Sequence, residues 1–274
     1  MCTLTRHDGG FSEFWSQPEP NGFSLFWLGQ AGFAIHAGSH RFLVDPYLSD
    51  SLEVKYRGTE KPHERMMPAP ARVEDFTGLD YVFCTHAHSD HMDPGTLPLI
   101  AQAFPDCRFV IPQAHWEKAR QIGVPDAAIL TIDAGQSLEL DCLKVRAIPA
   151  AHEQIQTDAD GHHHFLGYLW NDRGVTIYHS GDSIPYDGLS TAIGRADLAL
   201  LPVNGRGKGV QGNFTFEEAA RLCQEANIPS LIPHHFGMFA FNTTDRAALE
   251  MDAARTSSPQ ILLPDVTSWI SIKT

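Results

Sequence analysis

The sequence of 274 residues predicts an α/β (α+β) protein that folds as one domain, with two β-sheets between outer helices in a four-layer αββα sandwich. Two β-rich halves, about 23–150 and 151–274, support this prediction because each contains strand patterns flanked by helical ones. Several predicted strands end in histidine or aspartate, at residues 86–91, 152, 182 and 235. Two facing sheets would bring these strand ends to one edge, and neither half looks independent of the other.

The N-terminal part of the chain changes character at residue 23. Residues 1–22 are polar and rich in glycine and proline, which predicts an arm or docking segment and not a core element. Three strands with short glycine-containing turns are expected next, over residues 23–28, 33–36 and 41–44. Residues 49–72 are charged, contain prolines and show no periodicity, so we expect a long loop close to the mouth of a site.

The rest of the chain alternates between helical and strand patterns, which is typical of βα units. Helices are predicted over residues 97–104, 114–122, 216–226 and 245–254. Strands are predicted over residues 81–83, 108–111, 129–149, 165–170, 175–179, 196–201, 230–233, 261–263 and 269–272. Thr215 and Glu218 form a capping-box pattern that opens the third of these helices.

The segment 84–91, with the sequence CTHAHSDH, directly follows a buried strand pattern. In an extended segment alternate side chains share a face, so we expect His86 and His88 to point the same way and to bind one metal ion. Asp90 and His91 follow where the chain turns, and from there they can reach a second ion. Nitrogen and oxygen ligands at this spacing suit zinc, with manganese or iron as alternatives.

Further candidate ligands follow later strands. A lone histidine at a strand end is usually only a polar residue, but His152 is placed to complete the site begun by the first motif. Asp182 follows Gly181, which allows the backbone close to a ligand, so its carboxylate could bridge two ions; an ordinary turn is the alternative. The strand at 230–233 leads into His234 and His235, either of which could be the last ligand.

Other residues allow both a structural and a functional interpretation. Asp45 either forms a turn before a proline or orients a metal-bound histidine. The loop 162–164 is either an exposed hairpin or places an imidazole, such as that of His164, on the substrate. The glycine-rich segment around Arg206 and Lys208 is either a flexible surface loop or a binding loop for an anion.

Composition limits the class of protein and its partners. The formal net charge is −13, which disfavours nucleic-acid binding because phosphates require a basic surface. The five cysteines form no C-x-x-C pair, and the N-terminus has no apolar core of a signal peptide, so a cytoplasmic protein is expected. The sequence contains no run of 18 apolar residues, so no membrane span is expected. A small molecule is the expected partner, and the oligomeric state, monomer or homo-oligomer, is left open.

The pattern His-x-His-x-Asp-His, followed by His, Asp and His, resembles the metallo-β-lactamase superfamily from about residue 23 onward. The segments 27–33 (WLGQAGF), 178–183 (YHSGDS) and 233–239 (PHHFGMF) look like the branch that contains L-ascorbate-6-phosphate lactonase. N-acyl phosphatidylethanolamine phospholipase D is similar in the metal motifs and more distant. The chain is shorter than the lactonase, and its loops 49–72 and 153–164 do not match, so the substrate is not carried over.

The resemblance implies the metallo-β-lactamase sandwich and a role for each candidate. The implied ligands are His86, His88 and His152 for one ion, Asp90, His91 and His235 for a second, and Asp182 between them. The family pattern of a histidine two residues before a glycine favours His235, which leaves His234 behind the ligands or facing the substrate. An aspartate at the place of Asp45 lies near the site in superfamily members.

The predicted function is that of a metal-dependent hydrolase, in which a metal-bound hydroxide attacks a small anionic, phosphorylated lactone or ester. Two divalent ions, zinc or manganese with iron not excluded, would lower the pKa of a bound water to about 7. Asp90 would steer the proton of the nucleophile, and Arg206 or Lys208 would hold the anionic group. A phosphodiesterase or phospholipase D-like hydrolase is the alternative. The second alternative is a non-catalytic metal-binding protein of the same fold, and the complete ligand set argues against it.

Overall fold

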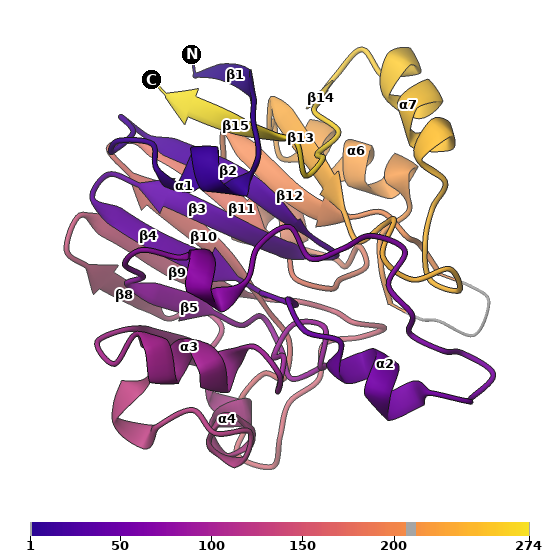
Figure 1. The fold of residues 1–274 in the computed structure, drawn as a ribbon. Helices are drawn as coiled ribbons and strands as arrows, with labels where there is room; N and C mark the ends of the chain where they lie inside the picture. The colour runs from indigo at the N-terminus through magenta and orange to yellow at the C-terminus, as the bar shows by residue number, and fades with distance from the viewer. Residues whose placement is uncertain (1, 207–211, 274) are drawn as a thin grey trace.

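The computed structural model describes residues 2–206 and 212–273. Two β-sheets lie face to face, and helices cover the outer face of each (Figure 1). The layers therefore run helix, sheet, sheet and helix, and the predicted α/β class with its αββα sandwich is confirmed.

The first sheet has eight strands and comes mostly from the first half of the chain. In spatial order they are β1 (Thr3–Asp8), β15 (Ser268–Lys273), β2 (Phe23–Gly29), β3 (Gly32–Ala37), β4 (His40–Val44), β5 (Tyr81–Phe83), β6 (Arg108–Pro112) and β7 (Ile129–Ile132). Strands β2, β3 and β4 form an antiparallel meander, whereas β4 to β7 run parallel. Strands β4 and β5 therefore end at the same edge.

The second sheet has seven strands from the rest of the chain. In spatial order they are β14 (Gln260–Ile261), β13 (Ser230–His234), β12 (Leu198–Pro202), β11 (Val175–His179), β10 (Leu166–Asp172), β9 (Leu143–Pro149) and β8 (Ser137–Leu140). Strands β11 to β14 are parallel, and β10 runs against both β9 and β11. The carboxyl ends of β9, β11 and β13 consequently share one edge.

The helices are short, and the structure also has single turns of 3-10 helix. The α-helices are α1 (Phe11–Trp15), α2 (Ser51–Tyr56), α3 (Leu97–Ala103), α4 (Trp116–Gln121), α5 (Leu189–Ile193), α6 (Phe216–Glu225) and α7 (Arg246–Arg255). The 3-10 turns are η1 (Val73–Asp75), η2 (Gln113–His115) and η3 (Asp126–Ala128). Helix α6 begins with the predicted capping box, in which Thr215 Oγ1 accepts from Glu218 N–H and Glu218 Oε2 accepts from Thr215 N–H.

Both faces of the first sheet are buried, which explains why β2 is apolar on both faces apart from Ser24. Side chains alternate along this strand: Phe23, Leu25 and Trp27 enter the core between the sheets. Phe26 and Leu28 enter a second core under α1, α3 and α4. Helices α6 and α7 bury apolar side chains on the second sheet. The strands that end at the site are thus held on both sides.

The N-terminal segment belongs to the core, so the prediction of an arm that is not a core element is wrong. Strand β1 pairs with β15 at the edge of the first sheet. Helix α1 buries Phe11, Phe14 and Trp15 against the outer face of that sheet. These residues are spaced i, i+3 and i+4 and form one helix face, but the glycines and prolines around them conceal the signal in the sequence.

The loop expected over residues 49–72 contains α2, and α5 was also not expected from the sequence. Both helices are only five or six residues long. A periodic pattern needs a longer window than this, so neither helix could be predicted from apolar spacing.

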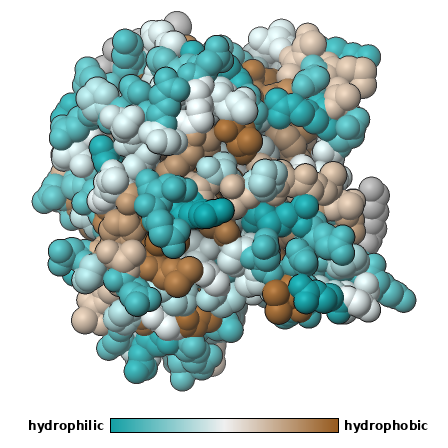
Figure 2. All heavy atoms as spheres, in the orientation of Figure 1, coloured by the Kyte–Doolittle hydropathy of each residue, from teal (hydrophilic) through white to brown (hydrophobic). Residues whose placement is uncertain are grey.

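The visible face of the molecule is mostly hydrophilic, and its hydrophobic side chains gather in small separate patches (Figure 2). Among residues 2–206 and 212–273, no helix has both the length and the apolar character needed to cross a membrane.

Candidate metal centre

The candidate ligands occupy loops that follow four strands of the two sheets. They follow β5 (His86, His88, Asp90 and His91), β9 (His152), β11 (Asp182) and β13 (His235). Because these strands end at neighbouring edges, the fold gathers side chains that are far apart in the sequence. Ring contacts and close ion pairs connect all seven residues into one cluster.

The loop after β5 is coiled and not extended. The N–H groups of His91 and Met92 both donate to the carbonyl oxygen of His88, at 3.0 and 2.8 Å. His86 and His88 nevertheless lie side by side, with ring centroids 4.6 Å apart and His86 Nε2 3.0 Å from His88 Nδ1. The two rings meet as expected, but through a turn and not through the alternation of a strand.

His91 lies at the centre of the cluster and is buried between carboxylates. Its Nδ1 lies 2.6 Å from Asp45 Oδ2, and its Nε2 lies 3.4 Å from Asp182 Oδ1 and 3.7 Å from Asp90 Oδ2. Burial alone would lower the pKa of His91, but these three carboxylates raise the pKa well above its ordinary value. Burial opposes the charged form of Asp182, yet His235 and His91 hold the pKa of Asp182 well below its usual range.

The two adjacent histidines at the end of β13 occupy different environments. His235 Nε2 lies 3.4 Å from Asp182 Oδ2 and 3.6 Å from Asp90 Oδ2, so His235 belongs to the cluster. His234 is fully buried and stacks on His179, with ring centroids 4.7 Å apart. The expectation that His234 faces the substrate is therefore wrong, because its ring is part of the core behind the cluster.

His152 completes the cluster on the side of His88. Their ring centroids are 5.1 Å apart, and the centroid of His86 is 5.9 Å from that of His152. His152 Nδ1 donates to the carbonyl oxygen of Gly212 at 3.1 Å, which leaves Nε2 as the nitrogen available to a ligand. A side chain at Gly212 would overlap the His152 ring, so this glycine permits the close approach.

The donor atoms divide into two overlapping groups. One oxygen or nitrogen atom from each of His86, His91 and Asp182 lies within 4.8 Å of the other two. The same holds for Asp90, His91 and His235, which is the set expected for the second ion. His91 belongs to both groups, and Asp182 lies beside it, so the two groups adjoin each other.

The residues present fit divalent metal ions. His91 Nε2 and Asp182 Oδ1 are buried, lie 3.4 Å apart and have no hydrogen-bond partner among the described residues. Buried polar atoms without partners are costly, and a bound cation would satisfy both of these. Imidazole nitrogens and carboxylate oxygens are ligands of zinc, manganese and iron, so the donor set does not select one of them.

A layer of hydrogen bonds fixes the orientation of the cluster. Besides its contact with His91, Asp45 accepts from the backbone N–H of Thr85 at 2.8 Å and from Thr85 Oγ1 at 2.7 Å. His179 Nε2 donates to Ala31 O at 3.0 Å, and His179 Nδ1 accepts from the N–H of Gly181 at 3.0 Å. Asp45 thereby positions His91, and His179 positions the turn that carries Asp182.

Gln30 is a site residue whose role could not be derived from the sequence. Its side-chain Nε2 donates to Asp90 Oδ2 at 2.9 Å and lies 3.2 Å from His235 Nε2, while its backbone carbonyl oxygen accepts from the backbone N–H of His235 at 2.8 Å. The one sequence feature that points to Gln30 is its position within the WLGQAGF segment, on which the resemblance to the lactonase branch rests in part.

Backbone strain is concentrated around the cluster. Gln30, Asp45, Glu153 and His235 have positive φ angles of 51°, 46°, 81° and 64°. Such angles are uncommon for residues with a side chain and persist where the surrounding structure enforces them, often at functional sites. The strain therefore supports a functional role for the edge where these loops meet.

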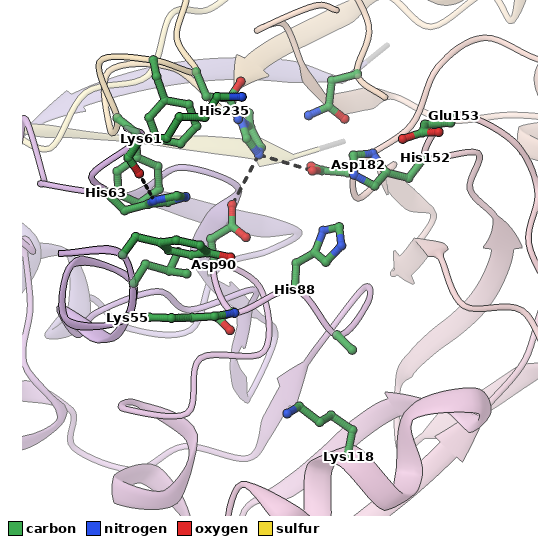
Figure 3. A pocket seen from close by; sticks show the side chains of 18 residues that line it. Lys55, Lys61, His63, His88, Asp90, Lys118, His152, Glu153, Asp182 and His235 are labelled. Carbon is green, nitrogen blue, oxygen red and sulfur yellow. Dashed lines mark hydrogen bonds and ion pairs between the residues drawn. The ribbon is translucent and has the colours of Figure 1, made fainter. Parts of the chain in front are cut away.

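The cluster forms the inner wall of a cavity of about 590 Å³ (Figure 3). His88, Asp90, His152, Asp182 and His235 all line it. The opposite wall comes from α2 and the loop that follows it, so residues 49–72 lie at the mouth of the site as expected. A volume of this size suits a small-molecule ligand.

Other residues expected to touch the substrate lie elsewhere. The Arg206 guanidinium pairs with Glu218 and donates to Asn213 O at 2.9 Å, and Arg206 does not line the cavity. The carbonyl oxygen of His164 accepts from His115 Nε2 at 2.8 Å, and His164 is also absent from the cavity wall. The structure therefore does not bring Arg206 or His164 to this cavity, and Lys208 lies outside the described residues.

Comparison with known proteins identifies the class. A model of the β-lactamase superfamily domain matches residues 40–236. A UPF0173 metal-dependent hydrolase of Myxococcus xanthus is 25% identical over 252 residues, which cover 87% of this chain and 80% of that protein. N-acyl-phosphatidylethanolamine-hydrolyzing phospholipase D 1 of Caenorhabditis elegans is 24% identical over 259 residues, covering 89% of this chain and 71% of that protein.

The fold is similar to that of solved structures as well. An isothiocyanate hydrolase from Delia radicum gut bacteria superposes with a TM-score of 0.73 at 19% identity, covering 92% of this chain and 98% of that one, which is evidence for the fold alone. Two facing sheets with histidine and aspartate at the strand ends define a metallo-β-lactamase fold. The family match covers most of the chain, and the protein belongs to the β-lactamase superfamily domain family.

Proposed function

We propose that this protein is a metal-dependent hydrolase that cleaves an ester or lactone bond of a small molecule. The observation that carries the proposal is the pair of overlapping donor groups, centred on His91, at the inner wall of a cavity. The relative from Myxococcus xanthus, named as a metal-dependent hydrolase, supports the reaction class.

The implied ligands would hold two divalent ions, zinc or manganese with iron as an alternative. In this proposal His86, His88 and His152 hold one ion, Asp90, His91 and His235 hold the other, and Asp182 bridges them. The ring contacts of His86 and His88 with each other and of His88 with His152 support the first set, and the ion pairs of Asp182 with His91 and His235 support the bridge. Bound ions supply a water of lowered pKa and a Lewis acid for the electrophilic oxygen. The donor chemistry and the buried atoms without partners support this occupancy.

Asp90 is the carboxylate best placed to accept a proton from the attacking water. It lines the cavity, and Gln30 Nε2 and His235 hold its Oδ2 atom in place. Asp182, by contrast, is almost completely buried among histidines. Water adds across the acyl–oxygen bond, which gives a carboxylate and a hydroxyl group, or a single hydroxy acid from a lactone.

The resemblance to the lactonase branch supports the choice of bond. The three segments that carry it contribute Gln30, the turn around His179 and Asp182, and the histidines at the end of β13, all of which surround the cluster. We propose a lactone or ester with an anionic group, such as a phosphorylated sugar acid, as the substrate class.

Phosphodiester cleavage is the second candidate, and the relative from Caenorhabditis elegans, named as a phospholipase D, favours it. The same donor set serves a phosphorus centre. A non-catalytic protein of this fold is the least supported alternative, because the ligand set has no gap and opens on a cavity.

The test is a substrate panel with protein stripped by a chelator and reloaded with Zn²⁺ or Mn²⁺. The panel contains γ-lactones, a phosphorylated sugar-acid lactone, aryl acetates and bis(4-nitrophenyl) phosphate. Metal-dependent hydrolysis of a lactone or ester is the expected result. Turnover of the phosphodiester alone would select the second candidate, and turnover of none by the loaded protein would reject hydrolysis of these bonds.

A further inference from the structure

Lysines are concentrated at the cavity. The sequence contains six, at positions 55, 61, 118, 144, 208 and 273. Three of these, Lys55, Lys61 and Lys118, line the cavity, although the chain as a whole carries a net charge of −13. No arginine lines it within the described residues. The lysines at the cavity therefore do not simply reflect a basic protein surface, because the chain as a whole is acidic.

Lys55 and Lys118 approach the cavity from different elements, α2 and α4. Both extend toward the space beside His88 and Asp90 (Figure 3). Lys55 Nζ lies 4.9 Å from the centre of the Tyr56 ring, which restricts its movement. In the described part of the chain, no carboxylate lies within 4 Å of either ammonium group, unlike Lys144, which pairs with Glu139 at 3.8 Å.

The wall next to Lys55 is aromatic. Tyr56 stacks on His63 with ring centroids 4.2 Å apart, and the centroid of His63 lies 5.1 Å from that of Phe239 and 4.6 Å from that of Phe241. His63 Nδ1 also donates to Lys61 O at 2.9 Å, so the imidazole is held on both sides. A wall of rings held by one another is preorganised to bind a flat or apolar group.

Negative groups also face the cavity, namely Asp90, Asp182 and Glu153. The first two belong to the proposed metal centre, where bound ions would offset their charge. Glu153 and Lys61 each have a further interaction, so neither is counted as an available charge at the cavity. Lys55 and Lys118 therefore remain as the two ammonium groups available at the mouth.

We propose that Lys55 and Lys118 bind an anionic group of the substrate, a carboxylate or phosphate, while Tyr56, His63, Phe239 and Phe241 bind its apolar or aromatic part. The substrate class is an anionic ester or lactone with an apolar body. This inference rests on the proposed function for its link to turnover, but the binding site itself does not require turnover. It assigns the anion to lysines on α2 and α4, and not to Arg206.

The first experiment compares 4-acetoxybenzoate with phenyl acetate as substrates at low ionic strength. The variants are Lys55→Met, Lys118→Met and the double variant, with Lys144→Met as a control that removes one positive charge outside the cavity. The ratio of the KM for the anionic ester to that for the neutral ester should rise about two- to fivefold in each single variant and about tenfold in the double variant. An unchanged ratio in the double variant would overturn the inference.

The second experiment measures binding without turnover by calorimetry of the protein as purified. The probes are 4-acetamidobenzoate, 4-acetamidophenylphosphonate and neutral acetanilide. Both anions should bind more tightly than acetanilide, and the double lysine variant should remove that preference while Lys144→Met keeps it. Tighter binding of one anion identifies the carboxylate or the phosphate as the natural group, and equal binding of all three probes would contradict the inference.

The two experiments separate the two hypotheses. If no ester is hydrolysed but the lysine-dependent preference for anions is present, the proposed function fails and the anion site remains. If esters are hydrolysed and the preference is absent, the hydrolase remains and the anion site is rejected. For the aromatic wall, Phe241→Leu should raise the KM for both aryl esters about threefold, whereas a change of Phe104→Leu, at the residue directly after α3 and outside the cavity wall, should not.

Discussion

Replacing Asp45 by asparagine tests whether this buried carboxylate prepares His91 for metal binding. Asp45 has almost the same shape as asparagine, but it accepts three hydrogen bonds, from Thr85 N–H, Thr85 Oγ1 and His91 Nδ1. An asparagine keeps only one acceptor oxygen. If that oxygen accepts from the Thr85 N–H, the amide nitrogen faces His91 Nδ1 at the position where Oδ2 now lies 2.6 Å away.

A donor at that position favours the other tautomer of His91, with the proton on Nε2. Nε2 is the atom directed at Asp182, so the proton would occupy the position that a metal ion requires. Loss of such a supporting carboxylate typically reduces metal affinity 10- to 100-fold, which corresponds to about 1.4 to 2.8 kcal/mol. We expect an effect near the upper end, because both side chains are completely buried and water cannot replace the contact.

The assay is competition for Zn²⁺ with a fluorescent chelator at pH 7.5, with circular dichroism to confirm folding. Asp172→Asn is the matched control, since Asp172 is a buried aspartate on β10 that makes no contact with the cluster. Asp45→Asn should lose affinity at least tenfold, and Asp172→Asn should stay within twofold of the wild type. Equal affinities in a folded Asp45→Asn variant would refute the proposed role.

Further predictions concern the adjacent histidines, a glycine and a remote buried histidine. His235→Ala should reduce Zn²⁺ affinity at least tenfold, whereas His234→Ala should keep the metal content and lower the thermal midpoint, because only His235 reaches the carboxylates. Gly212→Ala should displace the His152 ring and lower metal content without unfolding the protein, as metal analysis and circular dichroism would show. Burial, and after it the positive charge of Arg41, lowers the pKa of His36 to about 3 in the folded protein. The unfolded chain therefore binds a proton that the folded chain does not, and the free energy of unfolding falls as the pH drops below 6.5. Between pH 7 and pH 5 the wild type should lose about 2 kcal/mol more unfolding free energy than His36→Leu in denaturant titrations, and parallel losses would contradict this.

Much of the fold could be predicted because strand patterns and their ends are local features. The strand patterns at residues 23–28 and 81–83 predict β2 and β5, and both strands are present. The sequence does not predict helix α1, because its three apolar residues are too few to stand out between glycines and prolines. The same limit applies to α2, whose six residues form part of the cavity wall.

The sequence predicts the candidate ligands and one of their neighbours, but not the other residues around them. For Asp45 the strand end allows either a turn or a role beside a metal-bound histidine, the resemblance favours the second, and the structure places Asp45 against His91. Charge and a glycine-rich context favour an anion-binding role for Arg206, yet Glu218, in the first turn of α6, binds its guanidinium. Lys118 is an ordinary helical lysine in the sequence, and only the packing of α4 beside the loop after β5 brings it to the cavity.

The central claim is that the strand-end cluster binds divalent metal ions that the reaction requires. The most direct measurement combines metal content and hydrolysis for chelated and reloaded protein and for Asp182→Ala, with Asp187→Ala, an exposed aspartate nearby, as the control. We predict about two equivalents of Zn²⁺ or Mn²⁺ and restored hydrolysis in the wild type and the control, and loss of both in Asp182→Ala. Full hydrolysis by the chelated protein, or unchanged metal content in a folded Asp182→Ala variant, would contradict the account.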